Sequence, residues 1–243
     1  MLKEQQQLGQ RQITEFVEKL KSAASDNLVN LTVYGSAVSE EFHPEFSDIN
    51  LLCVLREASA SSLQALAPVI CWWTAQKFPA PLVFSQQEIP EAAKVFPIEM
   101  LDIRQQHHVL FGKDIFADLN VPLDRHRFQL EHDLRTKLLL LRQHYLLANG
   151  DQKKIGWLML DSISNFATLF RHALLAMRQE APKTKSEVIE QLALKIQFDP
   201  SPFLQLLQIR QRKQSAGNIN VHELFSRYQG AIERVIQALE AMN

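Results

Sequence analysis

Residues 31–55, LTVYGSAVSEEFHPEFSDINLLCVL, contain two strand-like runs separated by a Gly-Ser turn and a polar loop. The first run, Leu31–Tyr34, is β-branched and aromatic, and Gly35-Ser36 ends it. The second run, Ile49–Leu55, is almost wholly apolar, which is typical of a strand buried on both faces. This stretch therefore predicts a strand, a turn, a loop and a second, buried strand.

Two polar side chains, Asp48 and Asn50, break the apolar character of the second run. They are two residues apart, so on a strand they point to the same face of the sheet. The backbone N–H groups of the Gly-Ser turn and the serine hydroxyl suit phosphate oxygens, and the two oxygen ligands suit Mg²⁺. The pattern predicts a triphosphate site.

The same residues resemble the signature of the DNA polymerase beta-type nucleotidyltransferase superfamily, in which Gly-Ser, a spacer and Asp-x-Asp lead into a strand. The resemblance covers roughly the first half of the chain, and Asn50 stands where the family normally has its second aspartate. It implies that Gly35 lets the backbone approach the phosphates and that Ser36 donates to a terminal phosphate oxygen. It further implies that Asp48 binds Mg²⁺ and that Asn50 offers its carbonyl oxygen to the metal.

Residues 95–103, VFPIEMLDI, are predicted to form another strand, with Glu99 and Asp102 on opposite faces. The superfamily carries a third carboxylate on a strand beside the Asp-x-Asp strand, in a similar sequence context. The resemblance assigns that position to Glu99, which would help deprotonate the acceptor or hold a second metal, and the trailing acid to Asp102. Asp102 remains an alternative metal ligand, and both residues are also compatible with an exposed polar strand face.

The rest of the first half alternates between helical and strand patterns. Apolar spacing predicts helices over residues 11–24 and 59–77, a strand over 82–84 and a short helix over 87–94. Residues 107–112, HHVLFG, are expected to turn out of the sheet. The adjacent His107 and His108 would face opposite ways, which makes them poor joint metal ligands.

After residues 120–123, which we interpret as a linker, the pattern becomes helical throughout. Helix starts are indicated by Asp151, by the capping-box pair Thr184 and Glu187, by Ser201-Pro202 and by Asn220. We predict an α+β protein with two domains. Residues 1–122 would form a nucleotidyltransferase-like mixed sheet with flanking helices, and residues 123–243 an all-α bundle of five helices.

Composition narrows the class of protein. The chain has 243 residues, 46% of them hydrophobic, which is enough for a packed core, and a formal net charge of −1, which does not favour nucleic acid as a partner. The sequence shows neither a signal-peptide pattern nor an apolar run of membrane-span length, so we expect a cytoplasmic protein without a membrane partner. The two cysteines, Cys53 and Cys71, are expected to be buried thiols.

The resemblance implies Mg²⁺-dependent transfer of a nucleoside monophosphate from an NTP to a hydroxyl of a small-molecule or protein acceptor. Aminoglycoside nucleotidyltransferases pair such a catalytic domain with a helical domain that helps bind the acceptor, and the helical half resembles them in architecture. It is equally compatible with homodimer formation. Because Asn50 removes a negative charge where metal should bind, the competing hypothesis is a catalytically weakened nucleotide-binding or interaction module.

Overall fold

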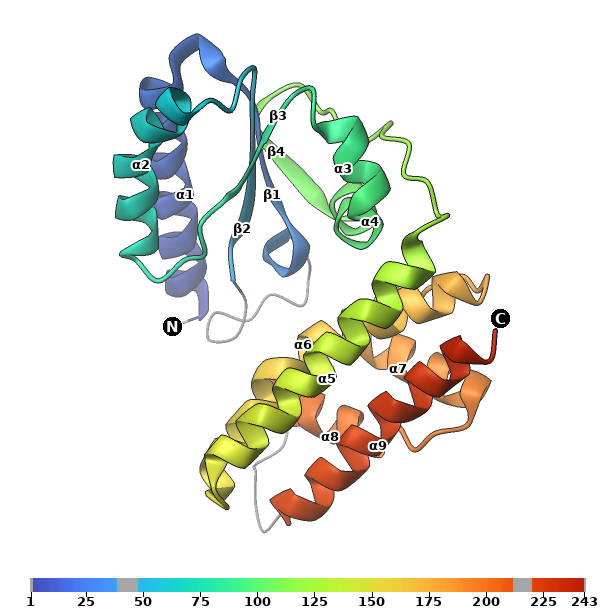
Figure 1. The fold of residues 1–243 in the computed structure, drawn as a ribbon. Helices are drawn as coiled ribbons and strands as arrows, with labels where there is room; N and C mark the ends of the chain where they lie inside the picture. Colours follow the sequence, from blue (N-terminus) through green and yellow to red (C-terminus); the bar gives the residue numbers. More distant parts are fainter. Residues whose placement is uncertain (1, 39–47, 212–219, 243) are drawn as a thin grey trace. The chain divides into compact units, whose positions relative to one another are not determined.

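A computed structural model describes residues 2–38, 48–211 and 220–242. The chain divides into two compact units, residues 1–123 and 124–243. Figure 1 shows a small sheet flanked by helices in the first unit and helices alone in the second. The α+β fold class predicted from the sequence is therefore confirmed.

The sheet has four strands in the order β3-β2-β1-β4. Their bounds are Leu28–Tyr34 (β1), Asn50–Leu55 (β2), Leu82–Ser85 (β3) and His107–Gly112 (β4). The inner strand β1 is antiparallel to β2 and to β4, whereas the other inner strand, β2, is parallel to β3. The sheet is therefore mixed, as predicted, with β3 and β4 at its edges.

Helices cover both faces of the sheet (Figure 1). One face packs against α1 (Leu2–Ala24) and α2 (Ala60–Thr74), and the other against α3 (Ile89–Val95) and α4 (Pro97–Gln105). Strand β2 is buried from its second residue onward and alternates between these two cores. Its even-numbered side chains therefore face α3 and α4, and its odd-numbered ones face α1 and α2.

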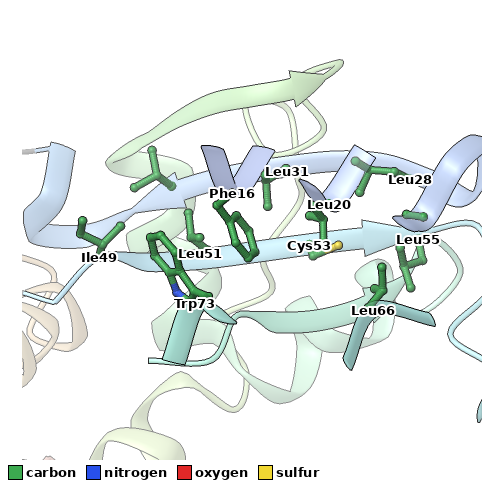
Figure 2. Close-up of a cluster of buried hydrophobic side chains, with 12 residues drawn as sticks. Phe16, Leu20, Leu28, Leu31, Ile49, Leu51, Cys53, Leu55, Leu66 and Trp73 are labelled. Carbon is green, nitrogen blue, oxygen red and sulfur yellow. The ribbon is translucent and has the colours of Figure 1, made fainter. Parts of the chain in front are cut away.

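Trp73 is the largest fully buried side chain in the core beneath α1 and α2 and lies at one end of it (Figure 2). Its ring lies 4.7 Å from that of Phe16, and its indole N–H donates to the Pro79 carbonyl at 2.9 Å. Cys53 lies in the same core, where burial raises the pKa of its thiol to about 12. Cys71 is exposed, so the expectation of two buried thiols is wrong for this residue. The reason is geometric, because α2 buries Leu66 and Trp73 and leaves Cys71 outside.

The strand predicted over residues 95–103 is wrong, because this segment forms the end of α3 and most of α4. Pro97 occupies the first turn of α4, where its missing N–H costs no hydrogen bond and its fixed φ suits a helix. The residues that follow, Ile-Glu-Met-Leu-Asp-Ile-Arg-Gln, include several good helix formers. The spacing of the apolar residues in this short segment is compatible with the two-residue period of a strand as well as with the period of a helix, which explains the wrong prediction.

The expectation that residues 107–112 leave the sheet is also wrong, because they form β4 along the outer side of β1. Gly112 ends the strand with φ +84, and a Cβ at this position would lie 2.1 Å from the Val29 carbonyl oxygen. Only glycine tolerates this close approach in a left-handed conformation. His107 and His108 do point to opposite faces, since they pair with Tyr34 and Val33.

The described part of the second unit forms five helices, as predicted. They are α5 (His126–Ala148), α6 (Gln152–Ala176), α7 (Lys185–Ile196), α8 (Ser201–Arg210) and α9 (Val221–Glu240). Asp151 and Asn220 accept backbone N–H groups at the starts of α6 and α9, and Thr184 and Glu187 form a complete capping box on α7. None of the described helices has the length and apolarity needed to cross a membrane.

Candidate functional site

The turn that follows β1 is the centre of the candidate site. Gly35 has φ +74, and its N–H donates to the Gln106 carbonyl at 3.2 Å, so the turn is tied to the residue just before β4. A short 3-10 helix, Gly35–Val38, continues from it. The side chain of Ser36 and the whole of residues 39–47, including Ser47, lie outside the described part of the chain.

A row of three side chains crosses the sheet at this turn. Tyr34, the last residue of β1, pairs with Asn50 on β2 and with His107 on β4. Directly paired residues of antiparallel strands project to the same face. Tyr34 packs with the core beneath α3 and α4, so the row faces these two helices. The structure therefore brings together Gly35 and Asn50, as the sequence predicted, and adds His107.

Asp48 precedes the row and is exposed, whereas Asn50 is half-buried. The two strands that flank β2 are both fully described, and neither carries a carboxylate: β1 is LVNLTVY and β3 is LVFS. The third carboxylate expected on a strand beside β2 is therefore absent from both of these strands. A carboxylate for this end of the sheet has to come from another element.

Helix α4, which packs on the face that carries the row, contains the two predicted carboxylates, Glu99 and Asp102. Burial raises the pKa of the Tyr34 phenol to about 12, and the negative charges of Glu99 and then Asp102 act in the same direction. Their influence on Tyr34 places both carboxylates in the electrostatic environment of the row. The two predicted carboxylates thus lie on a helix rather than on the expected strand, and their roles remain predictions.

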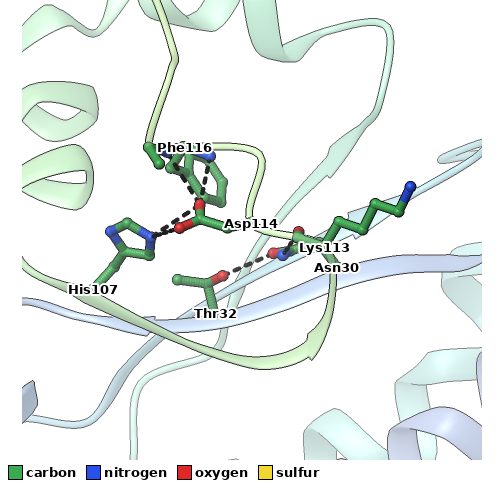
Figure 3. A network of polar contacts seen from close by, with 7 residues as sticks. Asn30, Thr32, His107, Lys113, Asp114 and Phe116 are labelled. Carbon is green, nitrogen blue, oxygen red and sulfur yellow. Dashed lines mark hydrogen bonds and ion pairs between the residues drawn. The ribbon is translucent and has the colours of Figure 1, made fainter.

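His107 is held by a polar network that the sequence analysis did not predict (Figure 3). Its Nε2 lies 3.1 Å from both carboxylate oxygens of Asp114. Asp114 also accepts the N–H groups of Phe116 and Ala117, at 2.9 and 3.0 Å. Although desolvation opposes it, these hydrogen bonds and the neighbouring imidazole hold the pKa of the Asp114 carboxyl below its usual value. Asp114 lies two residues after the strand-ending Gly112, a common turn pattern that does not reveal its pairing with His107.

The residues at the turn offer hard oxygen ligands, which are the type that Mg²⁺ prefers. Asp48 supplies a carboxylate and Asn50 an amide oxygen, and Mg²⁺ in nucleotide sites often takes one or two carboxylates together with substrate phosphates. Across residues 2–38, 48–211 and 220–242, no group of three or more His, Cys, Asp or Glu is placed to hold a metal. These ligands fit a Mg²⁺ ion that binds together with a nucleotide better than a metal site formed by protein side chains alone.

Comparison with known proteins gives structural but not sequence matches. No family model matches the chain, and no curated protein matches its sequence. Among solved structures, the chain is similar to that described as spectinomycin adenyltransferase AAD(9) from Enterococcus faecialis with ATP and spectinomycin. The TM-score is 0.58 at 15% identity, and the match covers 92% of this chain and 99% of that chain.

The chain has the nucleotidyltransferase fold. The match extends over both units, because either unit alone is only about half of the chain. The fold that the resemblance at residues 35–50 implied is therefore confirmed. The roles of the individual site residues remain predictions.

Proposed function

We propose that this chain binds a nucleoside triphosphate at the end of β1 and transfers its nucleoside monophosphate to a hydroxyl of a small-molecule or protein acceptor. One observation carries the proposal: the Gly35 turn, Asn50 and the charges of α4 converge on Tyr34 at one end of the sheet. The similarity to an adenyltransferase solved with ATP and spectinomycin makes ATP the first nucleotide and spectinomycin the first acceptor to test.

In this proposal, Gly35 contributes space rather than a hydrogen bond, because its N–H is already used by the Gln106 carbonyl. Asp48 and Asn50 would hold Mg²⁺ against the phosphates, which would neutralise charge on the triphosphate. Glu99 would take the proton of the acceptor hydroxyl, with Asp102 as the alternative. The hydroxyl oxygen forms a bond to the α-phosphorus, and the bond to the bridging oxygen breaks to release pyrophosphate.

The second candidate function is nucleotide binding without transfer. It is favoured by Asn50 in place of a carboxylate and by the lack of any carboxylate on β1 or β3. A unit charge about 4 Å from its partner is worth roughly 4 kcal/mol at an effective dielectric of about 20. Losing it would lower a rate by about two or three orders of magnitude.

Two measurements test the proposal and separate the candidates. Thermal stability should rise by roughly 5–10 °C with ATP and Mg²⁺ at about 100 times the dissociation constant, since such binding stabilises by about 2.7 kcal/mol. Asp48→Ala should abolish the Mg²⁺-dependent part of this shift, whereas Asp118→Ala, an exposed aspartate in the loop after β4, should leave it unchanged. Pyrophosphate release with spectinomycin and other hydroxyl compounds then distinguishes transfer from binding.

Each outcome has a definite reading. A shift that depends on Asp48 together with pyrophosphate release supports transfer. The same shift without pyrophosphate release for any acceptor supports the binding module. No shift with any nucleotide rules out both candidates and leaves a fold retained for protein interaction. Homodimer formation through the helical unit is a separate prediction, which light scattering of the purified protein would test.

A further inference from the structure

Among the described residues of the candidate triphosphate site, Gly35, Asp48 and Asn50, none is a cation of the kind that usually accompanies phosphates. Residues 31–55 contain neither lysine nor arginine. On α4, Arg104 is directed elsewhere, since its guanidinium donates to the Leu119 carbonyl at 3.1 Å. In the described part of the first unit, the imidazole nearest to the Gly35 turn in the sheet is His107, one residue after the Gln106 carbonyl that accepts the Gly35 N–H.

The His107 ring is held in place by a hydrogen bond but remains accessible to solvent at one nitrogen. Only 10% of its side chain is exposed, and Nε2 faces the Asp114 carboxylate, which requires a proton on Nε2. Every buried side-chain nitrogen or oxygen among the described residues has a hydrogen-bond partner. Nδ1 of His107 has no partner among these residues, so this atom is not buried and must reach solvent. One nitrogen therefore holds the ring in place and the other remains available to a ligand.

The support behind Asp114 extends into the sheet. The buried Asn30 donates to the Lys113 carbonyl at 2.8 Å and accepts a hydrogen bond from Thr32 Oγ1 at 2.8 Å. This network fixes the backbone directly before Asp114. In Figure 3, Asn30 and Lys113 lie on the Asp114 side of His107, and the second ring nitrogen lies on the opposite side. Because Tyr34, at the far end of β1 from Asn30, pairs with His107, that nitrogen lies toward the end of β1 and its turn.

We propose that His107 is a phosphate-binding residue, which donates from Nδ1 to the terminal phosphates of a nucleoside triphosphate while Asp114 positions its ring. The proposal rests on the function proposed above and names one side-chain contact to the phosphates there. In the protonated imidazole both nitrogens donate, and the Asp114 carboxylate balances the charge on the Nε2 side. Asp114 is a positioning residue, since it contacts the imidazole and not the ligand.

The test compares dissociation constants for ATP, AMP and adenosine, measured by calorimetry with Mg²⁺ at one pH. His107→Gln should weaken ATP binding by about 10-fold or more, as expected for loss of a hydrogen bond to a charged group, and should change adenosine binding little. The matched control is His108→Gln, because His108 is exposed on the opposite face of β4. Asp114→Asn keeps the imidazole but removes its positioning carboxylate and should weaken ATP binding as well.

The way the loss of affinity depends on the number of phosphates distinguishes a direct contact between His107 and the phosphates from a structural effect of the substitution. Equal ATP affinity in wild type and His107→Gln, or equal loss for ATP and adenosine, overturns the proposal. If wild type binds no nucleotide, it is the proposed function that fails. A measurement on wild type avoids any folding defect of the variants: the ¹⁵N shifts of the His107 ring should change on adding ATP but not adenosine. Unchanged shifts in the presence of bound ATP overturn the proposal.

Discussion

Gly35 and Asn50 lie against each other at the end of β1: a Cβ on Gly35 would sit 3.5 Å from the amide nitrogen of Asn50. That separation is an ordinary contact, so space alone does not exclude alanine. The backbone does disfavour alanine, because φ of +74 lies in the left-handed region. We expect Gly35→Ala to lower the free energy of unfolding by about 1–2 kcal/mol, measured by urea titration.

Two other glycines provide comparisons for the effect of Gly35→Ala on the free energy of unfolding. Gly112→Ala should cost clearly more, because its Cβ would meet the Val29 carbonyl oxygen at 2.1 Å in addition to the backbone strain. Gly156 lies inside α6 with no atom within 4 Å of an added Cβ, so Gly156→Ala should raise stability by about 0.5–1 kcal/mol. If all three substitutions had the same effect, the explanation based on backbone conformation would be wrong.

Asn50→Asp tests whether the missing charge limits catalysis. If the chain is a transferase, the added carboxylate should increase pyrophosphate release by up to about two or three orders of magnitude. The control Asn120→Asp adds the same charge at an exposed position before the second unit and should have no effect. An unchanged rate in Asn50→Asp, with ATP binding retained, would favour the binding module.

Tyr34 predicts a loss of stability at high pH. The pKa of its phenol is raised from 10.0 to about 12, first by burial and then by Glu99 and Asp102, so the folded state favours the neutral form. The unfolded chain therefore loses this proton first, and stability that is fully present below pH 10 is lost as the pH rises toward 12. The loss should be at most about 1.4 kcal/mol per pH unit.

Tyr34→Phe isolates this contribution. Only the wild type loses the Tyr34 contribution as the pH rises. If the wild type is the more stable protein at pH 9, the difference between the urea midpoints of wild type and variant should therefore become smaller at pH 11–12. Tyr228, whose pKa burial also raises, is present in both proteins and cancels in the difference. Parallel pH curves for the two proteins would show that Tyr34 is not responsible.

The sequence was informative where the signals are local. The two strands around residues 31–55 and the capping box of Thr184 and Glu187 depend on neighbours within a few residues, and both form as predicted. The strand predicted over residues 95–103 failed because a short apolar run satisfies both periods, and Pro97 together with the helix-forming residues after it decides in favour of a helix.

The candidate site likewise contains one pair of residues that the local sequence predicted and one pair that it did not. Gly35 and Asn50 meet as expected because adjacent antiparallel strands bring the end of one beside the start of the next. The pair His107 and Asp114 could not be predicted, since it requires β4 to join β1 and the following turn to fold back over the sheet. Such non-local pairing leaves no periodic signal in the sequence.

Glu99 and Asp102 can be ranked by their effect on a single phenol. Both raise the pKa of Tyr34, and Glu99 has the larger influence of the two. Glu99→Gln should therefore lower the Tyr34 pKa more than Asp102→Asn, as followed by NMR of ¹³C-labelled tyrosine, and Glu91→Gln on α3 should leave it unchanged. The carboxylate with the stronger effect lies electrostatically closer to the row that holds Asn50, which makes it the better candidate for the base. If pyrophosphate release depends instead on the other carboxylate, our preference for Glu99 is wrong and Asp102 takes that role.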